Sequence, residues 1–256
     1  LAPVLGVHAV HEQAFNERDK TQSAAFAQAY IQHFLQQAPI PGAEFDLQYA
    51  NQLLPGISLE DVNAYAARWI PDNGKTLTAL IAPEKTDYPL PDATALTKQL
   101  SEAYTQPVTP YIEKAVAKQL LAQNPAPGRL LSSELIPSIN LTTLTFANGT
   151  RVLLKPTDFK NDEVLLTGFR DGGTNRHPII DSLNADFAAS LDNITGLGTF
   201  TPNDLPKFLA GKSVSINAGL TASSDEFSGR ASATDLESML QLLYLQFTDV
   251  RQDPAL

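Results

Sequence analysis

Residues 141–155 read Leu-Thr-Thr-Leu-Thr-Phe-Ala-Asn-Gly-Thr-Arg-Val-Leu-Leu-Lys. Two alternating runs flank the pair Asn148-Gly149. An Asn-Gly pair between such runs is the strongest short signal of a β-hairpin, because both residues tolerate the positive φ of a type I′ turn. The stretch therefore predicts two antiparallel strands joined at this pair.

Working outward from the hairpin, the C-terminal part of the chain alternates between helical and strand patterns. Residues 179–194 have the spacing of a helix, with Leu183, Phe187 and Leu191 four apart on one face. Thr201-Pro202 predicts the start of the next helix, with threonine as N-cap and proline at the first position. Residues 213–217 and 226–233 predict strands.

The end of the chain predicts a helix from Thr234 that lies across this sheet. The apolar positions expected to face the sheet are Leu236, Leu240, Leu243, Phe247 and Val250. The whole pattern indicates an α+β fold in which an antiparallel-rich sheet packs against helices.

The N-terminal part predicts helices at residues 23–35 and 44–54, closed by prolines and Pro55-Gly56. Ser58 and Asp61 form a capping box for a third helix. Residues 76–82 predict a strand that enters a sheet. The buried face of the third helix is expected to comprise Val62, Tyr65, Ala66 and Trp69.

Residues 83–137 are rich in proline, which removes backbone donors and stiffens the chain. Two short helices are expected there, at residues 94–104 and 111–123. The segment predicts a semi-rigid strap, so we expect a domain division into residues 1–90, a linker at 91–137 and residues 138–256.

Composition excludes several classes of function. The net charge of −10 argues against nucleic acid or an anionic membrane as a partner. Cysteine is absent, which excludes disulfides and thiolate chemistry and fits an oxidising compartment. No apolar run is long enough to cross a bilayer, and the first residues lack the pattern of a signal peptide.

The order of these elements resembles the pitrilysin/insulinase-type zinc metallopeptidases, with their LuxS/metallohydrolase-type domains. Residues 141–155 are similar to the family's opening hairpin, residues 164–169 to its second strand, and Gly196-Leu-Gly198 to a glycine turn after a helix. Residues 16–20, 53–58 and 69–83 are similar to the closing part of a non-catalytic domain of this family. The resemblance covers nearly the whole chain, as an internal segment of a long bacterial member.

In active members the helix before the glycine turn carries H-x-x-E-H, in which two histidines bind zinc and the glutamate activates a water. The equivalent positions here are Phe187, Ser190 and Leu191. These side chains supply neither a metal ligand nor a general base, and His177 is the one histidine after His33. The resemblance thus implies a degenerate, catalytically inactive domain, with zinc bound elsewhere in the parent enzyme.

The resemblance further implies a structural function: the segment helps to form the peptide-binding chamber and joins its two halves. The implied partners are the other domains of the same polypeptide and the parent's peptide substrate, and the implied compartment is the periplasm. Peptides add to a sheet edge in this family, so the expected edge here comprises residues 213–217 and a neighbouring strand at 220–224, with Ser213, Ile216 and Asn217 as contact residues.

Two alternatives remain open from the sequence. His8, His11 and Glu12 share one face of a helix and could bind a metal ion, which would make the chain a metal-binding hydrolase. The chain could also be a non-catalytic assembly or binding subunit of a processing-peptidase-like complex.

Overall fold

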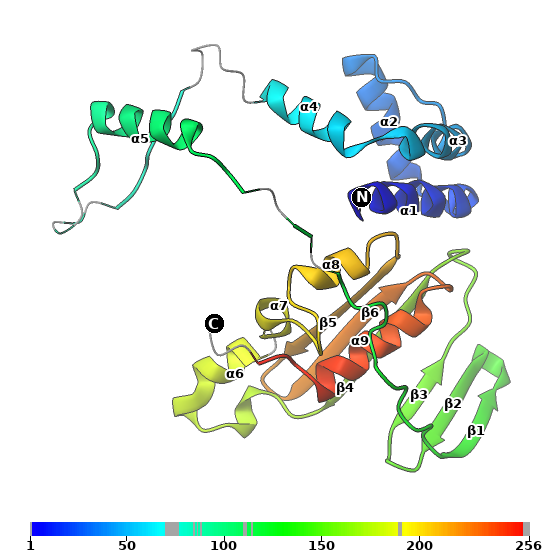
Figure 1. Ribbon diagram of the computed structural model, residues 1–256. Helices are drawn as coiled ribbons and strands as arrows, with labels where there is room; N and C mark the ends of the chain where they lie inside the picture. The colour runs from blue at the N-terminus through cyan, green and yellow to red at the C-terminus, as the bar shows by residue number, and fades with distance from the viewer. Residues whose placement is uncertain are drawn as a thin grey trace. The chain divides into compact units, whose positions relative to one another are not determined.

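A computed structural model of the chain describes residues 2–69, 77–83, 85, 87, 89–109, 112–113, 115–188 and 191–252 (Figure 1). The chain forms two compact units, and each is described separately. Ile57–Ala115 is one unit, and Leu1–Gly56 together with Val116–Leu256 is the other. The division predicted at residues 90 and 137 concerns which stretches correspond to peptidase-like domains, and it stays a prediction.

The larger unit begins with three helices, α1 (Ala2–Asn16), α2 (Ser23–Gln36) and α3 (Ala43–Leu53). Short 3₁₀ turns follow α1 at Arg18–Lys20 and α3 at Leu54–Gly56. The two helices predicted at residues 23–35 and 44–54 are therefore confirmed. Helix α1 packs along α3, so Ala50 of α3 is buried.

A small antiparallel sheet contains β1 (Leu130–Ile136), β2 (Leu141–Phe146) and β3 (Arg151–Leu154), in the order β1-β2-β3. A 3₁₀ turn at Pro137–Ile139 joins β1 to β2, and β1 was not predicted. Strands β2 and β3 confirm the hairpin that was predicted at Asn148-Gly149.

The turn of this hairpin differs from the predicted type I′. Gly149 has a φ of 86°, but Asn148 does not have a positive φ. The non-glycine residues with positive φ in the described part of the chain are Gln37 and Asn140. The N–H of Phe146 donates to the carbonyl of Thr150, and the N–H of Gly149 donates to the carbonyl of Phe146. This is a three-residue loop with glycine at the left-handed position, so only Gly149 needs a positive φ.

The larger sheet contains β4 (Val164–Asp171), β5 (Val214–Leu220) and β6 (Ser224–Ala231), in the order β4-β6-β5 with antiparallel pairing throughout. Two glycines let bulky groups lie close to the sheet. A Cβ on Gly168 would lie 2.0 Å from the ring of Phe227, and one on Gly229 would lie 2.7 Å from Sδ of Met239. The predicted α+β fold with antiparallel sheets is confirmed.

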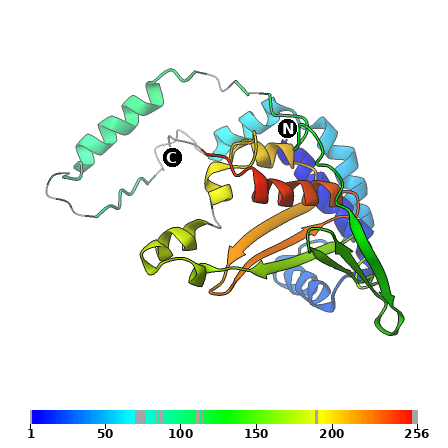
Figure 2. The same cartoon turned by 90° about the horizontal axis from the view of Figure 1, so that it is seen from below.

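Helix α9 (Leu236–Thr248) lies across this sheet in both Figure 1 and Figure 2. Its buried positions are Met239, Leu242 and Leu245, at 0%, 1% and 4% exposure. The predicted face was wrong in part, because Leu240 and Phe247 are 46% and 52% exposed. Asp235, and not Thr234, is the N-cap residue of α9.

The connection from β4 to β5 contains 3₁₀ turns at Thr174–Arg176 and Ile179–Asp181 and three short helices, α6 (Ser182–Ala188), α7 (Leu191–Thr195) and α8 (Asp204–Phe208). Of the helix predicted at residues 179–194, the described residues form the 3₁₀ turn at Ile179–Asp181, α6 and the first part of α7, while residues 189–190 lie outside the described part. Thr201 lies before α8, and its Oγ1 accepts a hydrogen bond from the N–H of Asp204 at 3.2 Å.

The core of the larger unit lies between α9, the α7–α8 region and β5. Its buried members are Leu120, Leu197, Phe200, Leu242 and Leu245. Leu120 belongs to the stretch at residues 111–123 that was predicted as a helix. The described residues of that stretch are irregular and not helical, and Leu120 among them is buried in the core.

The smaller unit contains α4 (Leu59–Trp69) and α5 (Ala93–Thr105). The capping box is confirmed: the N–H of Asp61 donates to Oγ of Ser58 at 3.1 Å, and the N–H of Ser58 donates to the Asp61 carboxylate at 2.9 Å. Asp92 caps α5 by accepting from the N–H of Ala95 at 2.8 Å.

Two expectations for the smaller unit were wrong. Residues 77–82 do not form a strand, because no partner strand pairs with them within the described residues; Thr76 lies outside these. Val62, Tyr65 and Trp69 are 51%, 58% and 75% exposed, so α4 does not bury the predicted face. The side chain of Ala66 lies outside the described part.

Candidate functional site

Strand β5 lies at the edge of the larger sheet. It pairs with β6 from Val214 to Leu220, and no strand of the described residues pairs with its other side. An unpaired strand edge presents a row of backbone N–H and C=O groups that can pair with an extended peptide. The strands β1, β3 and β4 are edge strands as well, and β5 is the edge that was expected from the sequence to bind a peptide.

The three predicted contact residues lie in different surroundings. Asn217 is exposed on the face of the sheet away from α9, whereas the side chain of Ile216 packs against the core beside Gly229. Ser213 precedes the strand and already has partners: its N–H donates to Asp235 and its carbonyl accepts from Ser232. Of the three side chains, that of Asn217 is the one exposed to solvent.

The second strand expected at residues 220–224 is not present. Residues 221–223 form the turn between β5 and β6, in which the N–H of Thr221 donates to the carbonyl of Ser224 at 2.8 Å. The strand that neighbours β5 is β6, and it pairs on the inner side of β5.

A pocket of about 300 Å³ lies where β5 ends, between the ends of β4, β6 and α9 and close to Ala188 of α6. Its floor is aromatic, since the rings of Phe227 and Phe247 meet edge to face at 5.5 Å. The guanidinium of Arg170 lies 5.7 Å from the ring centre of Phe247. The pocket combines apolar surface with charged groups at its rim, a common composition of sites for side chains of a ligand.

The charged groups of this pocket are held in place by Asp225. Its carboxylate accepts from the N–H of Gly173 at 2.8 Å and from Nε of Arg170 at 2.6 Å. These two hydrogen bonds, in that order, hold the pKa of Asp225 below its ordinary value. A Cβ on Gly172 would lie 2.4 Å from this carboxylate, so a larger residue there would have to displace the Asp225 side chain from its hydrogen bonds.

Sequence reasoning missed this pocket. The strand pattern of residues 224–231 contained a usable signal, because Asp225 and Phe227 are two apart and lie on one face of β6. What the pattern could not show is that Arg170 and Phe247 approach the same face from another strand and a helix.

Two of the positions predicted to correspond to the metal motif lie in α6 and α7. Phe187 is in α6 and Leu191 is the first residue of α7, with exposures of 64% and 44%. Ser190 lies outside the described residues. No group of three or more His, Cys, Asp or Glu side chains able to hold a metal ion is found among the residues that are described.

The cluster at His8, His11 and Glu12 is part of α1. Nε2 of His8 lies 2.8 Å from Oδ1 of Asn51 in α3, and Nδ1 lies 3.8 Å from the carboxylate of Glu12. Both ring nitrogens of His8 thus face protein groups, which is the arrangement of a contact between helices.

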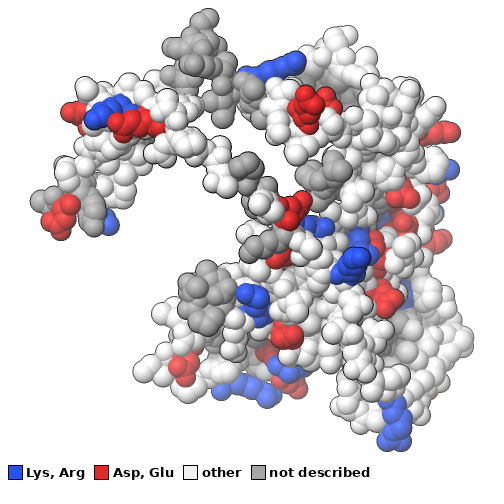
Figure 3. All heavy atoms as spheres, in the orientation of Figure 1, with Lys and Arg blue, Asp and Glu red and all other residues white. Residues whose placement is uncertain are grey.

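Charges are mixed over the surface. Figure 3 shows Lys and Arg atoms interspersed with Asp and Glu atoms among a majority of uncharged atoms on the face drawn. In the part of the chain that the structure describes, no helix has the length and apolar character needed to cross a membrane.

No protein-family model matches the chain. Among curated proteins, a zinc protease PQQL-like of Arabidopsis thaliana is 29% identical over 237 residues, which are 93% of this chain and 22% of that protein. Among solved structures, the ferredoxin protease FusC in complex with Arabidopsis ferredoxin matches 98% of this chain and 28% of its own, with 21% identity and a TM-score of 0.53. The periplasmic protease PqqL from Escherichia coli matches 96% of this chain and 27% of its own, with 16% identity and a TM-score of 0.49.

The sequence relationship to the plant protein extends over almost the whole chain, although the chain spans 22% of the length of that relative. The likeness to FusC concerns the fold, which covers both helical and sheet regions. The family resemblance inferred from the hairpin and the strands that follow it is confirmed. The chain thus resembles the pitrilysin/insulinase-type zinc metallopeptidases in sequence over 93% of its length.

Proposed function

We propose that this chain is a catalytically inactive structural segment of a zinc metalloendopeptidase, where it helps to form the peptide-binding chamber and joins the chamber's two halves. The observation that carries the proposal is the open edge of β5 beside a pocket, on a domain whose metal-motif positions hold Phe187 and Leu191. The β5 edge would bind the backbone of a peptide and the pocket would bind one of its side chains, while Phe187 and Leu191 offer no ligand to zinc.

The zinc site is proposed to lie in another part of a longer polypeptide. The curated relative is several times longer than this chain, which leaves room for a zinc-binding domain outside the segment that corresponds to this chain. The other domains of the same polypeptide are therefore the proposed partners, together with a peptide substrate. By analogy with family members we also propose a periplasmic location.

Peptide binding is proposed to occur by strand addition. A peptide that extends β5 would form main-chain hydrogen bonds along Val214–Leu220 and reach the pocket at the end of the strand. Main-chain pairing provides affinity for many sequences, and the aromatic floor of Phe227 and Phe247 would favour an apolar side chain at one position.

The test uses a fluorescently labelled, unstructured peptide and the purified chain with added zinc. We expect binding without cleavage, and slower hydrogen exchange at alternate amides of Val214–Leu220 when peptide is bound. The matched controls are two versions of the peptide in which alternate backbone nitrogens are methylated. One version removes the N–H groups that pair with β5 and should not bind, whereas the other removes those that point away and should bind normally.

Two results would contradict the proposal. Equal binding of both methylated peptides would exclude strand addition at β5. Zinc-dependent cleavage by this chain alone would exclude a catalytically inactive segment, and loss of that cleavage in His8→Ala and His11→Ala would favour the hydrolase alternative.

A further inference from the structure

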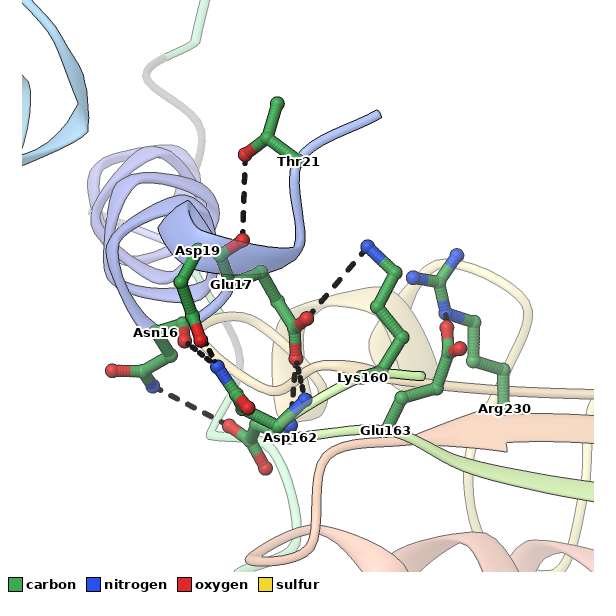
Figure 4. Close-up of polar contacts among 9 residues, drawn as sticks. Asn16, Glu17, Asp19, Thr21, Lys160, Asp162, Glu163 and Arg230 are labelled. Atoms are coloured by element: carbon green, nitrogen blue, oxygen red, sulfur yellow. Dashed lines mark hydrogen bonds and ion pairs between the residues drawn. The ribbon is translucent and has the colours of Figure 1, made fainter. Parts of the chain in front are cut away.

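We propose that the end of α1 and residues 160–162 form a latch, which holds residues 2–56 on the α+β part of the chain without help from the connecting residues 57–115. The inference does not depend on the proposed function. It rests on a set of polar contacts between segments that are far apart in the sequence, all of them within the larger compact unit (Figure 4).

The centre of the latch is the carboxylate of Glu17, which is 8% exposed and directly follows α1. Its Oε1 accepts hydrogen bonds from two consecutive N–H groups, those of Asn161 at 2.9 Å and Asp162 at 2.6 Å. Its Oε2 lies 3.7 Å from Nζ of Lys160. Burial of a carboxylate is costly unless it is paired in this way, so removal of either side leaves unsatisfied groups in the contact.

Two neighbouring side chains extend the contact. Nδ2 of Asn161 donates to the carbonyl of Asn16 at 2.9 Å and to the carboxylate of Asp19 at 2.5 Å. Asp162 accepts from the side chain of Asn16 at 3.4 Å and from the N–H of Ala233 at 2.8 Å. Through Asp162 the latch reaches the turn that leads into α9, and so the main sheet.

Helix α1 touches the same part of the fold at two further points. Oγ of Ser213 donates to Oε1 of Gln13 at 3.1 Å. Gly211 lies so close to Leu5 that an added Cβ would be 3.2 Å from that of Leu5. From Leu5 to Glu17 an α-helix rises about 18 Å. Contacts spread over this length fix both the direction and the rotation of α1, which a single point could not do.

The covalent connection runs through a separate compact unit, Ile57–Ala115. A tether raises the local concentration of the two segments but does not orient them. The latch supplies orientation through charge-assisted hydrogen bonds, which are stronger than neutral ones. The segments should therefore stay together after the tether is cut.

The experiment inserts a specific protease site after Val108, which is 86% exposed, and cuts the folded full-length chain. We expect the two pieces of the otherwise unaltered chain to elute together in size-exclusion chromatography at micromolar concentration. Glu17→Ala should weaken their association about a hundredfold, since it removes the carboxylate that accepts two charge-assisted hydrogen bonds in this part-buried contact. The matched control is Glu12→Ala on the same helix, whose side chain is 59% exposed and lies away from the latch.

A second measurement uses the uncut chain. The amide hydrogens of Asn161 and Asp162 should exchange about tenfold or more faster in Glu17→Ala than in the unaltered chain or in Glu12→Ala. Separation or aggregation of the cut, otherwise unaltered chain would overturn the inference. Equal exchange of these two amides in all three proteins would overturn it as well.

Discussion

The orientation of α9 can be tested with two leucines on the same helix. Leu242 is 1% exposed and belongs to the core cluster, whereas Leu240 is 46% exposed. Leu242→Ala removes buried carbon atoms and leaves a cavity that the surrounding side chains fill only in part, at a cost of about 3 kcal/mol. The space left by Leu240→Ala is open to solvent, so this substitution should lower the free energy of unfolding by about 1 kcal/mol or less.

The pair is well matched, because the change in helix propensity is the same at both positions and cancels in the difference. That leaves about 2 kcal/mol between the two variants. The assay is urea unfolding followed by far-UV circular dichroism. With a slope of about 2 kcal/mol per molar urea, the midpoints of the two variants should differ by about 1 M. Equal midpoints, or a lower midpoint for Leu240→Ala, would show that α9 presents the face expected from the sequence and would refute the reasoning.

Three further predictions follow from the packing and the charges. Gly229→Ala should destabilise the chain by about 1–3 kcal/mol, because its Cβ would meet Met239 at 2.7 Å, whereas Gly219→Ala, with open space around it, should leave the urea midpoint nearly unchanged. Asp225 has a pKa below its ordinary value in the fold, so its contribution to stability is present above about pH 4 and is lost as the pH falls through the folded pKa. The drop in urea midpoint from pH 7 to pH 3 should accordingly be smaller in Asp225→Asn, and an unchanged drop would contradict this. Calorimetric titration with zinc should show no tight stoichiometric site, and a site that disappears in His11→Ala would refute that expectation.

The pocket lies beside α6, the helix that contains one of the positions predicted to correspond to the metal motif. Ala188 of α6 contributes to the pocket lining, and Phe187 of the same helix stands where active relatives are expected to carry a metal ligand. If the proposed function is correct, a domain without metal ligands would still offer a strand edge and a pocket to a peptide. Peptide contacts need backbone groups and apolar surface, and neither depends on imidazoles.

The features that sequence reasoning identified correctly are local ones. The capping box of Ser58 and Asp61 connects residues three apart, and the hairpin at Asn148-Gly149 depends on one turn. Even there the details differed: the loop contains three residues and needs a positive φ at Gly149 alone. The family resemblance was also readable, because the order of hairpin, strand, helix and glycine turn is a property of the chain itself.

The features that were missed depend on distant partners. The buried face of α9 includes Met239, which lies against Gly229 of β6, where a side chain would leave too little space, whereas Leu240 is exposed. A helix was expected at residues 111–123, yet the described residues there are irregular, and Leu120 is buried in the core of the larger unit. Residues 77–82 alternate as a strand would but lack a partner among the described residues, and an unpaired strand has no ladder of hydrogen bonds to hold it.

The sequence by itself thus determined the local elements, the antiparallel α+β class, the family resemblance and the identity of Phe187 and Leu191, two side chains that cannot bind a metal ion. Only the tertiary structure decided which strands lie at the edges of the sheet, where the pocket lies and how α1 is attached. The reason is physical: a cap or a tight turn is formed by neighbours in the chain, whereas the Glu17 carboxylate finds its donors at Asn161 and Asp162, which only folding brings within reach.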